Sequence, residues 1–278
     1  MSVQGWKYYN HAMIPTCAPH EEPDLTAIRN GQIWGKTTGG RTPLLARWTT
    51  DWDCKTETNW WYCIKDTPIV LEKLPKQARK DIRKGLKNCA VRTITVDQYT
   101  DQLYECYCAA WSKYKNADKA MDKDDFTRSC RERKELVYWA AFEAASGKLI
   151  GYFSVNEKNG YVEICQAKFH PDYLHIQVSG ALYYTVLNYY LEKEGIRYVS
   201  SGSRSINHVT NTQEYKEKTF GYRKAYCKLH IKFNPRVRWL MAAIYPLRSI
   251  TKKFDSHHAV HLLNSVLQMD EIARGSNE

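Results

Sequence analysis

The sequence lacks the signals of several protein classes. It contains no apolar run long enough to span a bilayer, and its first ten residues lack the apolar region of a signal peptide. Its nine cysteines are scattered, and none forms a Cys-x-x-Cys pair or a zinc-binding spacing. It also has no Gly-x-Ser-x-Gly elbow, the motif of serine hydrolases. We therefore expect a cytoplasmic protein with reduced cysteines, no metal site and no hydrolase chemistry.

Positive charge is in excess, with 41 Lys and Arg against 30 Asp and Glu in 278 residues, a net charge of +11. More than half of this excess lies in residues 73–87, which hold seven cations and one anion, Asp81. The spacing of Ala78, Ile82 and Leu86 predicts a helix whose other faces carry the cations. Such a face can bind the phosphates of an acyl carrier or an RNA backbone, or it is a solvated helix surface.

The pattern of the central part of the chain predicts three successive strands. After these, helices and strands alternate. Val178, Leu182 and Val186 recur at helical spacing, and Gly195 ends that helix. Thr210–Phe220 predicts a shorter helix. The expected strands are Leu136–Glu143, Lys148–Asn156, Gly160–Phe169, Ile196–Ser200 and Tyr222–Phe233.

The two ends of the chain have different compositions. Residues 1–57 are rich in tryptophan, tyrosine and proline, and we expect an ordered arm with strands at Gln32–Lys36 and Pro43–Thr49. Near the other end, the apolar run Trp239–Tyr245 is interrupted by Pro246 and flanked by arginine and lysine. That pattern suits either a helix that closes over the core or a helix at a membrane interface.

Residues 89–233 resemble the GNAT acyltransferase superfamily, and the whole chain resembles its Fem-type branch. Cys89–Thr95 would be the family's first strand, followed by helices at Gln98–Tyr114 and Asp124–Glu132. Gln177–Gly180 matches the start of the Q/R-x-x-G-x-G/A pyrophosphate loop, although Leu182 stands in place of its final small residue.

A second motif of the family follows the fifth strand. The segment from Gln213 to Tyr222 resembles the aromatic-Lys…Phe-Gly-aromatic signature, with Tyr215 as the first aromatic residue. The spacing within this segment is a residue or two longer than in the common forms of the signature.

The resemblance implies an α+β fold, a GNAT-like mixed and mainly antiparallel sheet flanked by helices. This core would occupy residues 89–233, after an N-terminal arm with a strand and the basic helix (1–88) and before a C-terminal helical extension (234–278). The third and fifth strands would separate at their C-terminal ends and open the cleft for an acyl carrier.

The activity implied by the resemblance is N-acyl transfer from the thioester of acyl-CoA or an acyl carrier protein to an amine, without a metal. Glu163, which simple alternation places on one strand face with Cys165 and Ala167, would be the general base if it is buried. Tyr215 would be the general acid, and Arg204 would bind a carboxylate or phosphate of the substrate. The residues expected to bind the acyl donor are Ala167, Phe169, Gln177, Val178, Ser179, Gly180, Ala181, Asn207 and Asn211.

Two other functions fit the same residues. The first is a Fem-type aminoacyltransferase that uses charged tRNA, for which the basic helix and the membrane-suited C-terminal segment would both have a use. The second is a non-catalytic GNAT-fold module that binds a lipid or a protein partner. In each case an anionic surface at the inner face of the membrane is a candidate partner.

Overall fold

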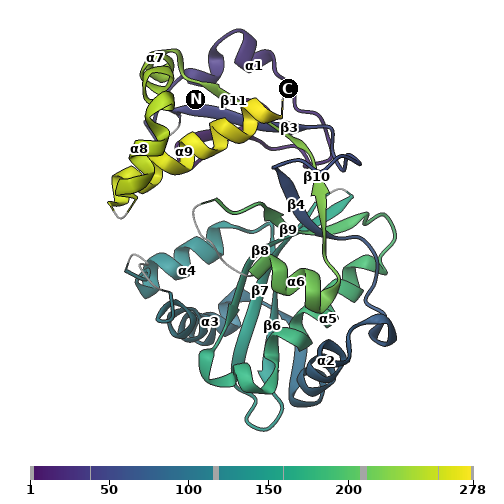
Figure 1. The fold of residues 1–278 in the computed structure, drawn as a ribbon. Helices are drawn as coiled ribbons and strands as arrows, with labels where there is room; N and C mark the ends of the chain where they lie inside the picture. Colours follow the sequence, from purple (N-terminus) through teal and green to yellow (C-terminus); the bar gives the residue numbers. More distant parts are fainter. Residues whose placement is uncertain are drawn as a thin grey trace. The chain divides into compact units, whose positions relative to one another are not determined.

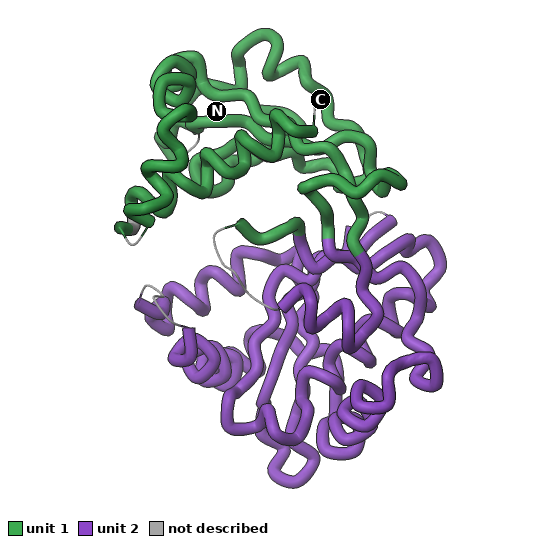
Figure 2. Tube along the Cα trace, in the orientation of Figure 1, with its two compact units in different colours: residues 1–62, 203–210, 224–278 green, residues 63–202, 211–223 purple. Residues whose placement is uncertain are grey.

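The chain divides into two compact units in the computed structural model, which describes residues 3–37, 39–114, 119–158, 160–206, 212–255 and 257–276 (Figure 2). Unit 1 comprises Met1–Tyr62, Ser203–Thr210 and Lys224–Glu278. Unit 2 comprises Cys63–Gly202 and Asn211–Arg223. These units cut across the three expected segments, because the basic helix packs with the central part of the chain and the last strand pairs with an N-terminal strand.

The larger sheet has seven strands in the order β10-β4-β9-β8-β7-β6-β5 (Figure 1). The strands β5 to β8 pair antiparallel in sequence order, and β8 and β9 pair in parallel. The expected mixed, mainly antiparallel sheet is therefore confirmed. The strands in sequence order are β4 (Trp61–Lys65), β5 (Cys89–Ile94), β6 (Leu136–Glu143), β7 (Leu149–Lys158), β8 (Tyr161–Phe169), β9 (Tyr198–Ser203) and β10 (Arg223–Tyr226).

Helices cover both faces of this sheet in unit 2 (Figure 1). One face is covered by α2 (Lys76–Asn88), α5 (Val178–Leu191) and α6 (Thr212–Phe220), and the other by α3 (Val96–Trp111) and α4 (Lys123–Glu132). Each face has its own apolar core. Ile82, Leu182 and Phe220 belong to the first core, and Leu103 and Phe126 belong to the second. The short 3-10 helices of this unit are η2 (Leu71–Lys73) and η3 (Pro171–Ile176).

Unit 1 is built on a four-stranded sheet in the order β1-β2-β3-β11. Ile33 and Ala46, which are fully buried, lie in one of its apolar clusters, and Leu229 and Ile272 pack in another. The strands are β1 (Trp6–Tyr9), β2 (Ala12–Pro15), β3 (Leu45–Thr50) and β11 (Lys228–Phe233). The helices are α1 (Thr26–Arg29), η1 (Gln32–Trp34), α7 (Pro235–Ile244), η4 (Tyr245–Leu247), α8 (Arg248–Thr251), η5 (Lys252–Phe254) and α9 (His258–Gly275).

Two elements differ from the sequence-based expectation. Tyr222–Phe233 does not form one long strand, because β10 and β11 belong to different sheets and the chain passes between them at Cys227. The strand expected at Gln32–Lys36 is the 3-10 helix η1. It follows Gly31, whose φ of 79° is a left-handed conformation that glycine adopts readily.

The close approach of α2 to α5 depends on two glycines. A Cβ atom at Gly85 would lie 2.4 Å from the carbonyl oxygen of Gln177 and 2.8 Å from the backbone nitrogen of Ala181. A Cβ atom at Gly180 would lie 3.2 Å from Cα of Ile82. Both distances at Gly85 are too short for a side chain, so the contact between the two helices requires glycine there.

This packing predicts that adding a methyl group at Gly85 destabilises the protein. Alanine is the better helix former by about 1 kcal/mol, yet the clash with α5 should outweigh that gain. We expect Gly85→Ala to lower the free energy of unfolding by about 1–3 kcal/mol in urea titrations. Gly275→Ala, at the end of α9 where a Cβ would meet no atom within 4 Å, is the matched control and should not be destabilised. Equal stability of the two variants would contradict the packing argument.

Candidate active site

The site lies where β8 and β9 separate. Their paired residues run from Tyr161 with Tyr198 to Glu163 with Ser200. Beyond these pairs β8 continues to Phe169. Parallel strands that stop pairing while both continue leave unpaired backbone groups and room for an extended ligand between them. The separation expected at the C-terminal ends of the third and fifth strands is therefore present.

Lys216 of α6 places a buried ammonium group beside this opening. Its side chain is 7% exposed, and its Nζ donates a hydrogen bond to Oγ of Ser201 on β9. The Nζ also lies 5.8 Å from the ring centroid of Tyr183 on α5. Burial lowers the pKa of Lys216, because removing the ammonium from water disfavours its charged form. Lys216 was not among the expected site residues, although the aromatic-Lys pair of the signature was a signal for it.

Tyr215 and Ser179, both expected site residues, lie together in the structure. The Tyr215 hydroxyl and Oγ of Ser179 are 3.1 Å apart and joined by a hydrogen bond between α6 and α5. Burial raises the pKa of Tyr215, so the phenol keeps its proton at neutral pH, and the Ser179 hydrogen bond acts in the opposite direction. Its side chain is nevertheless 40% exposed and accessible to a ligand. Tyr215 can therefore donate a proton or a hydrogen bond at this position.

A bulge in β8 changes the expected position of Glu163. The pairing with β7 skips Cys165, which is an extra residue in β8. Val162 and Ile164 belong to the core under α5, and Ala167 packs against that core, so Glu163 points to the opposite face. The expectation that Glu163 shares a face with Ala167 is therefore wrong, because the extra residue reverses the alternation.

Glu163 also has a partner and is not deeply buried. Its Oε2 lies 3.2 Å from Nζ of Lys158, and its side chain is 36% exposed. The described residues show no hydrogen bond or ion pair between Glu163 and Tyr215 or Lys216. The structure thus brings Tyr215, Ser179 and Lys216 together and leaves the expected base on the other face of the sheet.

The expected phosphate site at the start of α5 is covered by α2. Gly180, expected to admit a ligand to the backbone, instead admits α2: its hypothetical Cβ would lie 3.3 Å from the carbonyl oxygen of Asp81. Val178 and Ala181 are fully buried, and the Gln177 carbonyl packs on Gly85. The interpretation of Gly180 as a phosphate-binding glycine is therefore contradicted, because the close neighbour is a helix backbone.

The remaining expected site residues that the structure describes do not belong to the group formed by Tyr215, Ser179 and Lys216. Phe169 lies at the end of β8, with its ring centroid 6.4 Å from that of Tyr183. Arg204 belongs to unit 1, where its Nη1 donates a hydrogen bond to the Asn59 carbonyl oxygen at 2.6 Å and its guanidinium lies 4.7 Å from the Trp61 ring centroid. The expected residues Asn207 and Asn211 lie outside the described part of the chain.

Two further observations concern the described residues. They contain no group of three or more His, Cys, Asp and Glu side chains that could hold a metal ion. None of the helices formed by these residues is long and apolar enough to cross a membrane.

Comparisons with known proteins rest on structure. No family model matches the chain, and no curated protein matches its sequence. The crystal structure of FemX superposes with a TM-score of 0.51 and 8% identity, over 65% of this chain and 63% of the FemX chain. The chain therefore matches less than two thirds of the length of FemX. This likeness shows the fold, and the chain has a GNAT-like fold, as the sequence resemblance implied.

Two further solved structures are less similar. L-PGS from Bacillus licheniformis has a TM-score of 0.49 and 9% identity, over 86% of this chain and 83% of its own. The PaiA N-acetyltransferase from Thermoplasma acidophilum, solved in complex with coenzyme A, has a TM-score of 0.31 and 16% identity, over 39% of this chain and 74% of its own.

The buried ammonium predicts a distinctive effect of Lys216→Met on stability. Because burial lowers the folded-state pKa of Lys216 below its ordinary value, the unfolded chain binds the proton more tightly, and folding is disfavoured until the pH exceeds the unfolded pKa of about 10.4. Methionine has no charge to bury and therefore removes this cost.

We therefore expect Lys216→Met to raise the free energy of unfolding relative to the wild type at pH 7, by a margin that narrows as the pH rises toward the unfolded pKa. Urea titrations across this pH range measure the margin. Lys218→Met, on the same helix but with an exposed ammonium paired with Glu214, is the control and should show no such trend. A margin independent of pH would show that Lys216 is not held at a lowered pKa.

Proposed function

We propose that this protein is an acyltransferase that transfers an acyl group to an amine at the separated ends of β8 and β9. The observation that carries the proposal is the arrangement of Lys216, Ser201, Tyr215 and Ser179 beside the separation. In acyl transfer, negative charge develops first on the carbonyl oxygen and then on the leaving group. The buried ammonium of Lys216 and the accessible phenol of Tyr215 are two donors that suit these two steps. The GNAT-like fold agrees with this class of reaction.

The proposed reaction balances with these groups. The amine nitrogen attacks the acyl carbon, and the Nζ–H of Lys216 donates a hydrogen bond to the oxygen that gains the negative charge. The bond from carbon to the leaving sulfur or oxygen then breaks, and Tyr215 supplies a proton to the leaving atom. The acceptor attacks as the neutral amine, after its ammonium proton has passed to solvent. The second proton, which the attacking nitrogen loses as it becomes an amide, passes through water to the tyrosinate and restores the phenol of Tyr215. Glu163 would assist only through water, since it lies on the opposite face of the sheet.

The place that we propose for the acyl donor follows from the positive charge of α2 rather than from the glycine at the start of α5. A thioester of CoA or of an acyl carrier protein presents phosphate groups, and the start of α5 is covered by α2. The exposed cations of α2 are the alternative phosphate ligands, and they are Lys76, Lys80, Arg83, Lys84 and Lys87. We propose that the phosphates of the donor bind this face of α2.

Substitutions at the two donors test the acyl transfer. With acetyl-CoA and long-chain acyl-CoA and a panel of amines, we expect Lys216→Met to lower the transfer rate by about 10²–10³, the cost of removing a hydrogen-bond donor to a developing oxyanion. We expect Tyr215→Phe to lower it by about 10² or more, because the leaving atom loses its acid. Release of free thiol and mass spectrometry of the acylated amine measure the rate.

Two controls separate chemistry from damage to the fold. Lys218→Met and Tyr189→Phe change exposed residues of the same types on α6 and α5 and should keep the wild-type rate. If Lys216→Met and Tyr215→Phe both retain the wild-type rate in an established assay, these residues are not the catalytic donors. Binding of acyl-CoA without any turnover would instead favour a non-catalytic module.

A second candidate donor is charged tRNA, and the observation that favours it is α2 itself. The helix covers the expected pyrophosphate position of α5 and exposes a row of cations, which suits a polyanion better than a single pyrophosphate. The FemX likeness agrees with this reading at the level of fold. The reaction at Lys216 and Tyr215 would be the same, with the ester oxygen of the tRNA as the leaving atom.

Neutralising α2 tests this candidate. We expect Lys80→Gln, Lys84→Gln and Lys87→Gln together to weaken tRNA binding and to reduce the slope of log Kd against log salt by about 0.9 for each lost contact with a duplex phosphate. Fluorescence anisotropy at several salt concentrations measures both. Gln substitutions of Lys123 on α4 and Lys228 on β11, two exposed lysines in ion pairs, are the control. An unchanged slope in the α2 variant would remove RNA from consideration.

A further inference from the structure

The segment 235–254, comprising α7, η4, α8 and η5, exposes large apolar side chains along one side. Trp239 is 72% exposed and Leu240 is 59% exposed, and Leu247, Ile250 and Phe254 are each at least 50% exposed. Leu247, Ile250 and Phe254 follow one another at intervals of three and four residues, which is the repeat of one helix face. Surface helices of globular domains normally carry polar residues on this face.

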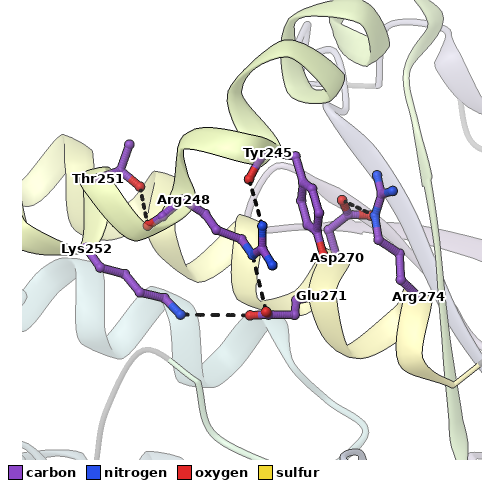
Figure 3. Close-up of polar contacts among 7 residues, drawn as sticks. All are labelled: Tyr245, Arg248, Thr251, Lys252, Asp270, Glu271 and Arg274. Atoms are coloured by element: carbon purple, nitrogen blue, oxygen red, sulfur yellow. Dashed lines mark hydrogen bonds and ion pairs between the residues drawn. The ribbon is translucent and has the colours of Figure 1, made fainter.

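The opposite side of the segment is held against α9. Figure 3 shows Arg248 directed toward Glu271, with Nε and Oε1 3.2 Å apart, while Lys252 approaches the other oxygen of Glu271 at 3.8 Å. The ring of Tyr245 lies under two guanidinium groups, 4.4 Å from that of Arg248 and 4.1 Å from that of Arg274. These contacts fix which side of residues 245–252 faces α9, and Leu247, Ile250 and Phe254 are exposed beside them.

The charge of the segment is of one sign. Residues 235–254 contain five arginines and lysines and no acidic residue. Glu271 of α9 engages two of these cations, Arg248 and Lys252. The described contacts show no ion pair for Arg236, Arg238 or Lys253, and Arg238 stacks on the neighbouring Trp239 with 4.8 Å between guanidinium and ring centroid. An anionic lipid surface has a layer of phosphate headgroups above a layer of acyl chains. The cations of the segment suit the headgroups, and the exposed tryptophan, leucine and phenylalanine beside them suit the acyl chains.

We propose that segment 235–254 docks unit 1 peripherally on an anionic lipid bilayer. The apolar side chains enter the boundary between headgroups and acyl chains, and Arg236, Arg238 and Lys253 bind the lipid phosphates. The segment is proposed to lie in the plane of the interface, as amphipathic helices with cations beside apolar side chains do. The proposal is independent of the acyl transfer, because it concerns a different unit and needs no substrate.

Vesicle binding by the 278-residue chain tests the proposal. We expect co-sedimentation with vesicles of phosphatidylcholine and phosphatidylglycerol, weakened by salt, and far weaker binding to vesicles of phosphatidylcholine alone. Leu247→Glu with Ile250→Glu should lower the partition coefficient about a hundredfold or more, because two apolar side chains leave the acyl boundary. Arg236→Gln with Lys253→Gln should lower it about tenfold or more on anionic vesicles.

Matched variants in unit 2 serve as controls. Val70→Glu with Leu174→Glu changes two exposed apolar residues, and Lys80→Gln with Lys84→Gln removes two cations of α2. Both should bind vesicles as the wild type does. If the wild type does not bind anionic vesicles, or if the α2 variant loses binding as strongly as the segment variant, the proposal is overturned.

Folding and protein contacts are checked with the same variants. If the glutamate variant is unfolded by circular dichroism, the paired glutamine variant, which changes only exposed cations, decides the question. Sedimentation equilibrium tests for a second copy as the occupant of the apolar side. Self-association that the glutamate variant abolishes, without vesicle binding by the wild type, would also overturn the proposal.

Discussion

The contact between α2 and α5 determines where a ligand can bind in unit 2. Gly85 and Gly180 bring the two helix backbones so close that a Cβ at Gly85 would meet the Gln177 carbonyl at 2.4 Å. Because α2 occupies the side of α5 at Gly180, this glycine does not admit a phosphate to the backbone in the way that a glycine loop would. The electropositive surface lies instead on the outer face of α2. The fold is thus GNAT-like, and the place that we propose for anions is the outer face of α2.

The same packing supports the candidate active site. The helix α5 carries both Ser179, which bonds Tyr215, and Tyr183, whose ring lies beside Lys216. Holding α5 with α2 therefore positions the two residues of α6 at the separated strands. Lys216 is buried without a described carboxylate partner, and its charged form is disfavoured there. Methionine would fill this position without the cost of burying an ammonium, and the proposed chemistry gives the lysine a use there.

The sequence predicts the order of the helices and strands well. It predicts less well on which face of a strand or helix each candidate site residue lies. The strands of the central sheet and the helix α5 follow from period and turn residues, which are local properties. The bulge at Cys165 is not visible in the pattern, because one extra residue in β8 is defined only by its pairing with β7. That single residue reverses the face of Glu163 relative to Ala167. The surroundings of Gly180 cannot be predicted from local pattern for a similar reason, because its neighbour Asp81 is distant in sequence.

At Cys227 the chain leaves β10 of the seven-stranded sheet and enters β11 of the four-stranded sheet. A continuous strand at Tyr222–Phe233 would have placed the residues that follow α6 and those that precede α7 in one sheet. Instead, β10 and β11 belong to different sheets. Each unit therefore completes its own core, and each exposes its own charged surface, α2 in unit 2 and segment 235–254 in unit 1. Of these, α2 has a narrow apolar side, on which Ala78, Ile82 and Gly85 are buried. Segment 235–254 has cations together with exposed tryptophan, leucine and phenylalanine. A purely ionic surface suits phosphates in water, and a mixed one suits phosphates above hydrocarbon, so the two surfaces fit different partners.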